Sequence, residues 1–127
     1  MKGKLISAHG YQGDAMNLPV ADANSAAAYY VEKMGFAIVG RGDEPHRKVV
    51  LERDGIQMAL AENGGEPEQD GCAFHTDNIA ALRDEFIAGG LDKIGAIGDD
   101  TQGGKKFKVF FVVAPDGLCY WFGEEQK

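Results

Sequence analysis

The sequence predicts an α+β fold made of two βαβββ modules. Two stretches have the composition and periodicity of short amphipathic helices, and each follows one strand-like segment and precedes three more. An Asp-Gly pair, which favours a tight turn, precedes the last strand of each half. The helix boundaries also match, because the same interval separates Asp22 from Gly35 and Asp77 from Gly90. This internal repetition favours a doubled module over an irregular α+β fold.

The first module is expected over about residues 14–62. Its first strand is predicted at 16–22, and a helix follows, with Asn24 or Ser25 as the cap and Gly35 as the stop. Three strands are predicted at 36–42, 47–55 and 56–62. The helical spacing predicts a buried stripe formed by Ala27, Tyr30, Val31 and Met34.

A polar linker at about 62–70 leads to the second module at about 71–125, so the whole chain, 1–127, is predicted to form one domain. Its first strand spans 72–77, and its helix runs from a cap at Asp77 to Gly89-Gly90. Three strands are predicted at 92–98, 105–114 and 118–124. The predicted buried side of this helix consists of Ile79, Leu82, Phe86 and Ile87.

Composition excludes several classes of function. Acidic residues number 20 against 13 basic ones, for a net charge of −7, which argues against a nucleic-acid partner. No apolar window approaches the length of a membrane span, and we expect no signal peptide and no membrane partner. Cys72 and Cys119 lack CxxC spacing, so reduced thiols and a cytoplasmic location are expected.

Four stretches together resemble the vicinal oxygen chelate superfamily of glyoxalases, bleomycin-resistance proteins and extradiol dioxygenases. They are LPVADANSAAAYYVEKMGF, LERDGIQMAL, CAFHTDNIAALRDEFIAGG and FFVVAPDGLCYWF. The resemblance implies a curved mixed sheet around a cavity, with the helices on its outer face. It also implies a homodimer, as in most small members. One such scaffold hosts lyases, isomerases, dioxygenases and binding proteins, so the fold does not decide the chemistry.

The resemblance also locates the positions at which metal-using members carry their ligands. Carried over one at a time, these positions fall on Ala15, Ala59, Gly71 and Trp121. None of the four side chains has a donor atom for a divalent ion. The sequence therefore predicts no metal site and no cofactor, and its pattern is closest to metal-independent bleomycin-resistance-like members.

Strand alternation gives the side chains that face the expected cavity, because residues two apart share a face. Trp121, the only tryptophan, would stack on a planar or cationic ligand. His75 would exchange a hydrogen bond or act as a general base. The predicted ligand-binding residues are Trp121, His75, Gln57, Asn17 and Cys119. Each also has a purely structural interpretation, and Trp121 in particular would fill the volume that a metal site would occupy.

Three functions therefore remain open. The leading hypothesis is a metal-independent protein that sequesters a small planar or cationic molecule, as bleomycin-resistance-type members do in clefts formed by a dimer. The second is an enzyme similar to lactoylglutathione lyase or an isomerase. It would use metal at displaced positions or acid–base chemistry by His75, and no catalytic residue is assigned. The third is an accessory domain without a small ligand, in which Trp121 packs tightly inside a filled cavity.

Overall fold

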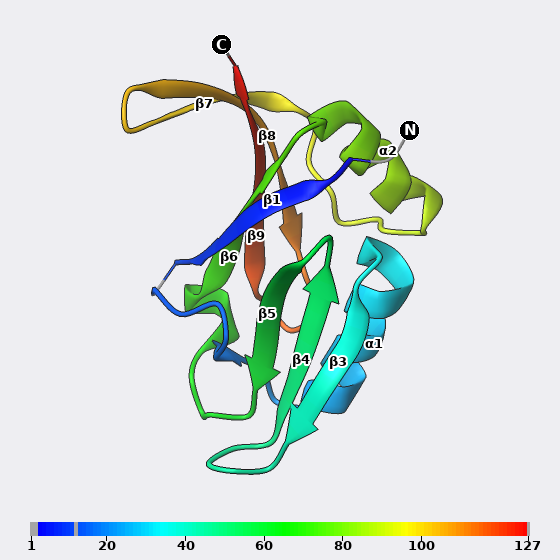
Figure 1. The fold of residues 1–127 in the computed structure, drawn as a ribbon, viewed down its shortest axis with the longest axis vertical. Coiled ribbons are helices and arrows are strands. Elements are labelled where there is room, and N and C mark those ends of the chain that lie inside the picture. The colour runs from blue at the N-terminus through cyan, green and yellow to red at the C-terminus, as the bar shows by residue number, and fades with distance from the viewer. Residues whose placement is uncertain (1–2, 12, 127) are drawn as a thin grey trace.

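The computed structural model describes residues 3–11 and 13–126, which form two mixed β-sheets and two α-helices (Figure 1). The four-stranded sheet has the order β2-β5-β4-β3, and the five-stranded sheet has the order β1-β6-β9-β8-β7. Each sheet contains the four strands of one βαβββ module, so the predicted α+β fold with two modules is confirmed. Neither helix in the described part of the chain is long and apolar enough to cross a membrane.

The first module consists of β2 (Leu18–Pro19), α1 (Ala23–Met34), β3 (Ala37–Gly42), β4 (Lys48–Arg53) and β5 (Ile56–Ala61). β2 runs parallel to β5, and the other pairs are antiparallel. The turn between β4 and β5 is the predicted Asp54-Gly55 pair, and both residues have positive φ, as a tight hairpin requires. Asp22 caps α1 by accepting the Ser25 amide at 3.1 Å.

The second module consists of β6 (Gly71–Thr76), α2 (Ile79–Ala88), β7 (Gly98–Gln102), β8 (Lys105–Val113) and β9 (Cys119–Gln126). A short 3-10 helix, η1 (Pro67–Gln69), lies within the predicted linker. β6 pairs in parallel with β9, which pairs antiparallel with β8. The cap of α2 is Asn78 rather than the predicted Asp77, because the Asn78 side chain accepts the Ala81 amide.

Two strands differ from the sequence-based expectation. The predicted strand at 16–22 shortens to β2, and an additional strand, β1 (Leu5–Gly10), precedes it and pairs antiparallel with β6. The predicted strand at 92–98 is replaced by β7, which starts at Gly98. The turn at Gly103-Gly104, with positive φ at both residues, pairs β7 with Lys105–Val109 of β8.

One hydrophobic core joins the two modules. Tyr30 of α1 contacts Tyr120 of β9 through a very short hydrogen bond between their hydroxyl groups, and both side chains are fully buried. Phe36, Phe74 and Phe122 extend this cluster by ring contacts at 5.2–5.9 Å. Both helices lie on the same side of the molecule and touch each other (Figure 1).

The buried sides of the helices were predicted correctly except at one position in each. Ala27, Tyr30 and Met34 are buried in α1, and Ile79, Leu82 and Phe86 are buried in α2. Val31 is 39% exposed and Ile87 is 45% exposed, contrary to prediction. Each of these two residues directly follows a buried aromatic residue, so its side chain points about 100° away around the helix from the one that enters the core.

Arg53, at the end of β4, ties both helices to the N-terminal segment. The residue is 8% exposed, and its guanidinium donates to the Met34 carbonyl at 2.6 Å, the Gly3 carbonyl at 2.9 Å and the Glu85 carboxylate of α2 at 2.7 Å. A planar group with five donors suits this arrangement of acceptors. Arg53 therefore bridges the two modules at the edge of the shared core.

Replacing Arg53 with alanine should lower the free energy of unfolding by about 3 kcal/mol, because it leaves the Glu85 carboxylate and two carbonyls without their partner. Urea denaturation would measure the loss. Arg41→Ala is the matched control, because Arg41 is exposed and its side chain donates to Asn24 at the surface, and it should change stability by less than about 0.5 kcal/mol. Equal losses for the two variants would contradict this role of Arg53.

Candidate functional site

The face of the five-stranded sheet that points away from the shared core carries a separate aromatic cluster. Alternation along β9 sends Tyr120 and Phe122 into the core, whereas Trp121 packs with Phe107, Val109 and Ala73. His75 of β6 completes this group, since its ring lies 5.1 Å from that of Trp121. We call these five residues, Ala73, His75, Phe107, Val109 and Trp121, the aromatic face.

Trp121 is buried in the aromatic face and does not present an open ring surface to solvent. Its side chain is 7% exposed, and its indole lies so close over Gly123 that a Cβ there would come within 2.3 Å of the ring. The indole N–H donates to a carboxylate oxygen of Asp100 at 2.9 Å. Phe107 packs edge-on at 5.3 Å. These contacts hold the indole in one orientation.

His75 lies beside His9 of β1 at the edge of the aromatic face, with their rings 5.8 Å apart. Burial, with a smaller contribution from His9, lowers the pKa of His75 below its usual value of 6.5. The imidazole is therefore neutral at pH 7 and can accept a proton. A depression of about 320 Å³ opens here, lined by Ile6, Ser7, His9, His75, Thr76 and Glu125.

Cys119 shares the face of Trp121, and its sulfur contacts the hydroxyl group of Tyr11. The Tyr11 hydroxyl donates to the Cys119 sulfur at 4.0 Å, and the Tyr11 amide donates to the Gly71 carbonyl at 2.9 Å. Burial, together with the nearby Cys119, raises the pKa of Tyr11 above its usual value. Tyr11 is therefore a neutral donor that covers this end of the site.

An exposed apolar strip continues the aromatic face along β8. Phe111 is 46% exposed and Val113 is 43% exposed, and they pair across the ladder with Trp121 and Cys119. A large exposed aromatic beside a buried aromatic cluster is typical of a surface that contacts a ligand or another chain.

The structure does not bring Gln57 and Asn17 to the aromatic face. Gln57 is exposed on β5, in the other sheet, and donates to Glu52 at 3.2 Å. Asn17 is also exposed and donates to Asp14 at 2.6 Å. Of the five residues predicted from the sequence, Trp121, His75 and Cys119 lie together and the other two lie apart.

The structure adds members that the sequence did not single out. Strand β1, which the sequence did not predict, places His9 beside His75. Asp100 and Phe107 arrive through the register of the β7–β8 hairpin. The alternation of KKFKVFFVV was a usable indication for Phe107 and Val109, because it assigns Phe110 and Val112 to the core and the intervening residues to the other face.

The structure shows the surroundings of two of the four positions that the resemblance assigned to metal ligands, Ala15 and Gly71. At Gly71 an added Cβ would lie 1.8 Å from the Cys119 carbonyl oxygen and 2.6 Å from the Tyr11 ring, so no ligating side chain fits. The Ala15 carbonyl is occupied by the Ala59 amide at 2.9 Å. Across the described residues, no group of three or more His, Cys, Asp or Glu side chains is arranged to hold a metal ion.

Comparison with solved structures finds the same fold in proteins that include a bleomycin-binding protein and a bleomycin resistance determinant. A bleomycin-binding protein solved with bleomycin shares 24% identity over 88% of this chain and 97% of its own, with a TM-score of 0.71. A bleomycin resistance determinant encoded on transposon Tn5 shares 25% identity over 88% and 96%, with a TM-score of 0.65. A glyoxalase/bleomycin resistance protein/dioxygenase from Alicyclobacillus acidocaldarius shares 16% identity over 88% and 89%, with a TM-score of 0.70.

No family model matches the sequence, and no curated protein matches it. The structural similarity extends over nearly the full length of both partners in each comparison. The chain therefore has the fold of these proteins, and this agrees with the fold that the four sequence stretches predicted.

Gly71→Ala should lower the free energy of unfolding by about 3 kcal/mol, because the new methyl group meets a backbone carbonyl that the β6–β9 ladder holds in place. Thermal or urea unfolding would measure it. Gly98→Ala is the matched control in the exposed strand β7, where an added Cβ meets nothing within 4 Å. A stable Gly71→Ala protein would show that this position can accept a ligating side chain.

Proposed function

We propose that the chain is a single-domain, metal-independent member of the vicinal oxygen chelate superfamily that sequesters a planar or cationic small molecule. The observation that carries the proposal is the aromatic face, in which Trp121 is oriented by Asp100 and bordered by the exposed Phe111. Aromatic surfaces bind flat, unsaturated molecules by stacking and attract cations through the ring quadrupole. The fold shared with bleomycin-binding and resistance proteins supports the same function.

The accessible part of the proposed site is the exposed strip formed by Phe111 and Val113, whereas the indole of Trp121 is buried. A ligand would lie on Phe111 and Val113 and contact the edge of Trp121, with His75 as a polar neighbour. The exposed strip formed by Phe111 and Val113 also favours a homodimer, because a second copy would cover one side of a ligand on this face. The acidic net charge of −7 favours a cation over an anion.

Fluorescence tests the proposal directly, because Trp121 is the only tryptophan. Titration with bleomycin or a planar organic cation should quench its emission saturably, and Phe111→Ala should weaken binding about ten-fold by removing a stacking surface. Val39→Ala is the matched control, since Val39 is 49% exposed on the other sheet. Absence of saturable quenching with folded protein would contradict the proposal and favour a domain without a small ligand.

A second candidate is metal-free acid–base catalysis by His75 on a carbonyl or phenolic substrate. The specific observation is the lowered pKa of this imidazole, which keeps it in the basic form at neutral pH. Activity would fall as the pH drops below the pKa of His75, because protonation removes the base.

A glyoxalase-type assay with the hemithioacetal of methylglyoxal and glutathione tests the second candidate. Turnover should fall at least 100-fold in His75→Ala and remain within about three-fold in His46→Ala, whose side chain is exposed in the loop before β4. Metal analysis of the purified protein accompanies the assay. Stoichiometric divalent metal that disappears in His75→Ala would overturn the metal-independent function.

A further inference from the structure

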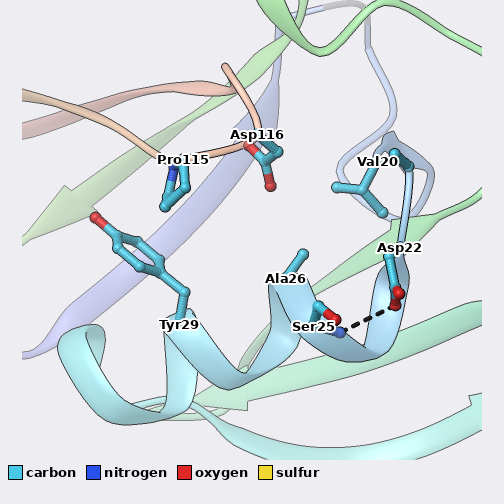
Figure 2. Close-up of a pocket in the computed structure, with 8 residues that line it drawn as sticks. Val20, Asp22, Ser25, Ala26, Tyr29, Pro115 and Asp116 are labelled. Carbon is cyan, nitrogen blue, oxygen red and sulfur yellow. Dashed lines mark hydrogen bonds between the residues drawn. The ribbon is translucent and has the colours of Figure 1, made fainter.

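A second cavity lies where the two modules meet, and none of its lining residues belongs to the aromatic face. Its walls come from the β2–α1 connection, the first two turns of α1 and the turn between β8 and β9 (Figure 2). The cavity measures about 250 Å³ and is lined by Val20, Ala21, Asp22, Ser25, Ala26, Tyr29, Pro115 and Asp116. We call it the junction pocket, and it shares no lining residue with the aromatic face.

The walls of the junction pocket are mainly apolar and include one aromatic ring. Figure 2 shows Tyr29 and Pro115 on one side, Val20 on the other and Ala26 between them. The Tyr29 ring is held by an edge-to-face contact with Tyr30 at 5.6 Å, and Tyr30 is itself fully buried. The pocket therefore offers a fixed slot for a flat or aliphatic body.

The charged groups of the pocket are two carboxylates, and they are not equivalent. The carboxylate of Asp22 caps α1 and also lies near Arg47, and both interactions lower its pKa. The Asp116 carboxylate accepts from backbone amides, including that of Leu118 at 3.0 Å, and no cation among the described residues pairs with it. Burial raises the pKa of Asp116, because its negative charge is less well solvated there than in water. The hydrogen bonds that it accepts do not fully offset this loss of solvation in the free protein.

We propose that the junction pocket is a ligand site for a small organic cation, an ammonium group carried on an aromatic or branched apolar body. The ammonium would donate to Asp116, whose carboxylate points toward the Ser25 and Ala26 side of the pocket (Figure 2). The apolar body would lie between Tyr29 and Val20. A partly desolvated carboxylate beside an aromatic ring is the arrangement that recognises an ammonium group.

Anionic ligands are excluded by the same groups. Amide groups at the start of α1, which would otherwise attract an anion, already have acceptors: the Ser25 amide donates to the Asp22 carboxylate and the Ala23 amide to the Glu62 carboxylate. Among the residues that the structure describes, no Lys, Arg or His lines the pocket. The inference depends on no part of the function proposed for the aromatic face, because the two sites share no residue.

The test uses the whole protein and phenethylammonium as the probe. Amide resonances of ¹⁵N-labelled protein are followed during titration, and saturable shifts are expected at Ser25, Tyr29, Gly117 and Leu118. Asp116→Asn should weaken binding about ten-fold or more, since it removes the charge but keeps the oxygen that accepts the Leu118 amide. Ala26→Leu should abolish binding by filling the slot.

Matched controls distinguish binding at the junction pocket from a general attraction of cations to an acidic protein. Asp84→Asn makes the same charge change at an exposed position of α2, and it should leave the affinity within two-fold. The neutral 2-phenylethanol should bind at least ten-fold more weakly than phenethylammonium, and 3-phenylpropionate should not bind.

Three outcomes would overturn the inference. The first is a set of shifts that Asp116→Asn and Ala26→Leu leave unchanged while both variants keep the native spectrum. The second is shifts confined to the aromatic face, at Trp121 and Phe111, which would support the function proposed there and remove the junction pocket as a site. The third is an absence of saturable shifts at the junction pocket while the quenching of Trp121 is normal, which would overturn only the inference made here.

Discussion

The hydroxyl pair between Tyr30 and Tyr120 joins the two modules inside one core, and the positions of both candidate sites follow from it. Burial raises the pKa of both hydroxyl groups well above the usual value, so neither ionises and each depends on the other as its partner. This contact holds α1 against β9. With α2 packed against β8 and β9, the core occupies one side of the five-stranded sheet and leaves the other side for Trp121.

Close backbone approach decides what the outward side of the sheet can carry. Gly71 lies so near the Cys119 carbonyl that it admits no side chain, and Gly123 leaves room for the indole of Trp121 to lie flat. The two glycines therefore act in opposite senses. Gly71 leaves no space for a side chain at a position that the resemblance assigned to a metal ligand, and Gly123 leaves space for the Trp121 ring. This geometry favours recognition by stacking over metal chemistry in the proposed function.

The interface between the modules gives the protein a second recessed surface. Asp116 belongs to the turn that leads directly into β9, and two residues of that strand, Cys119 and Trp121, lie on the opposite face. A cation bound at the junction pocket would contact residues of both modules and so stabilise their packing by mass action. The same shared core that fixes Tyr30 also positions the Tyr29 ring at the pocket wall.

Local patterns in the sequence determined the module repeat, the helix stops and the shared face of Trp121, His75 and Cys119, because propensity, turn chemistry and period-two alternation act between near neighbours. They did not determine which strands lie beside one another. Strand β1, the partners His9 and Asp100, the exposure of Val31 and Ile87, and the separation of Gln57 and Asn17 from Trp121 depend on register and on module packing. These are contacts between residues far apart in the chain, so only the tertiary structure decided them.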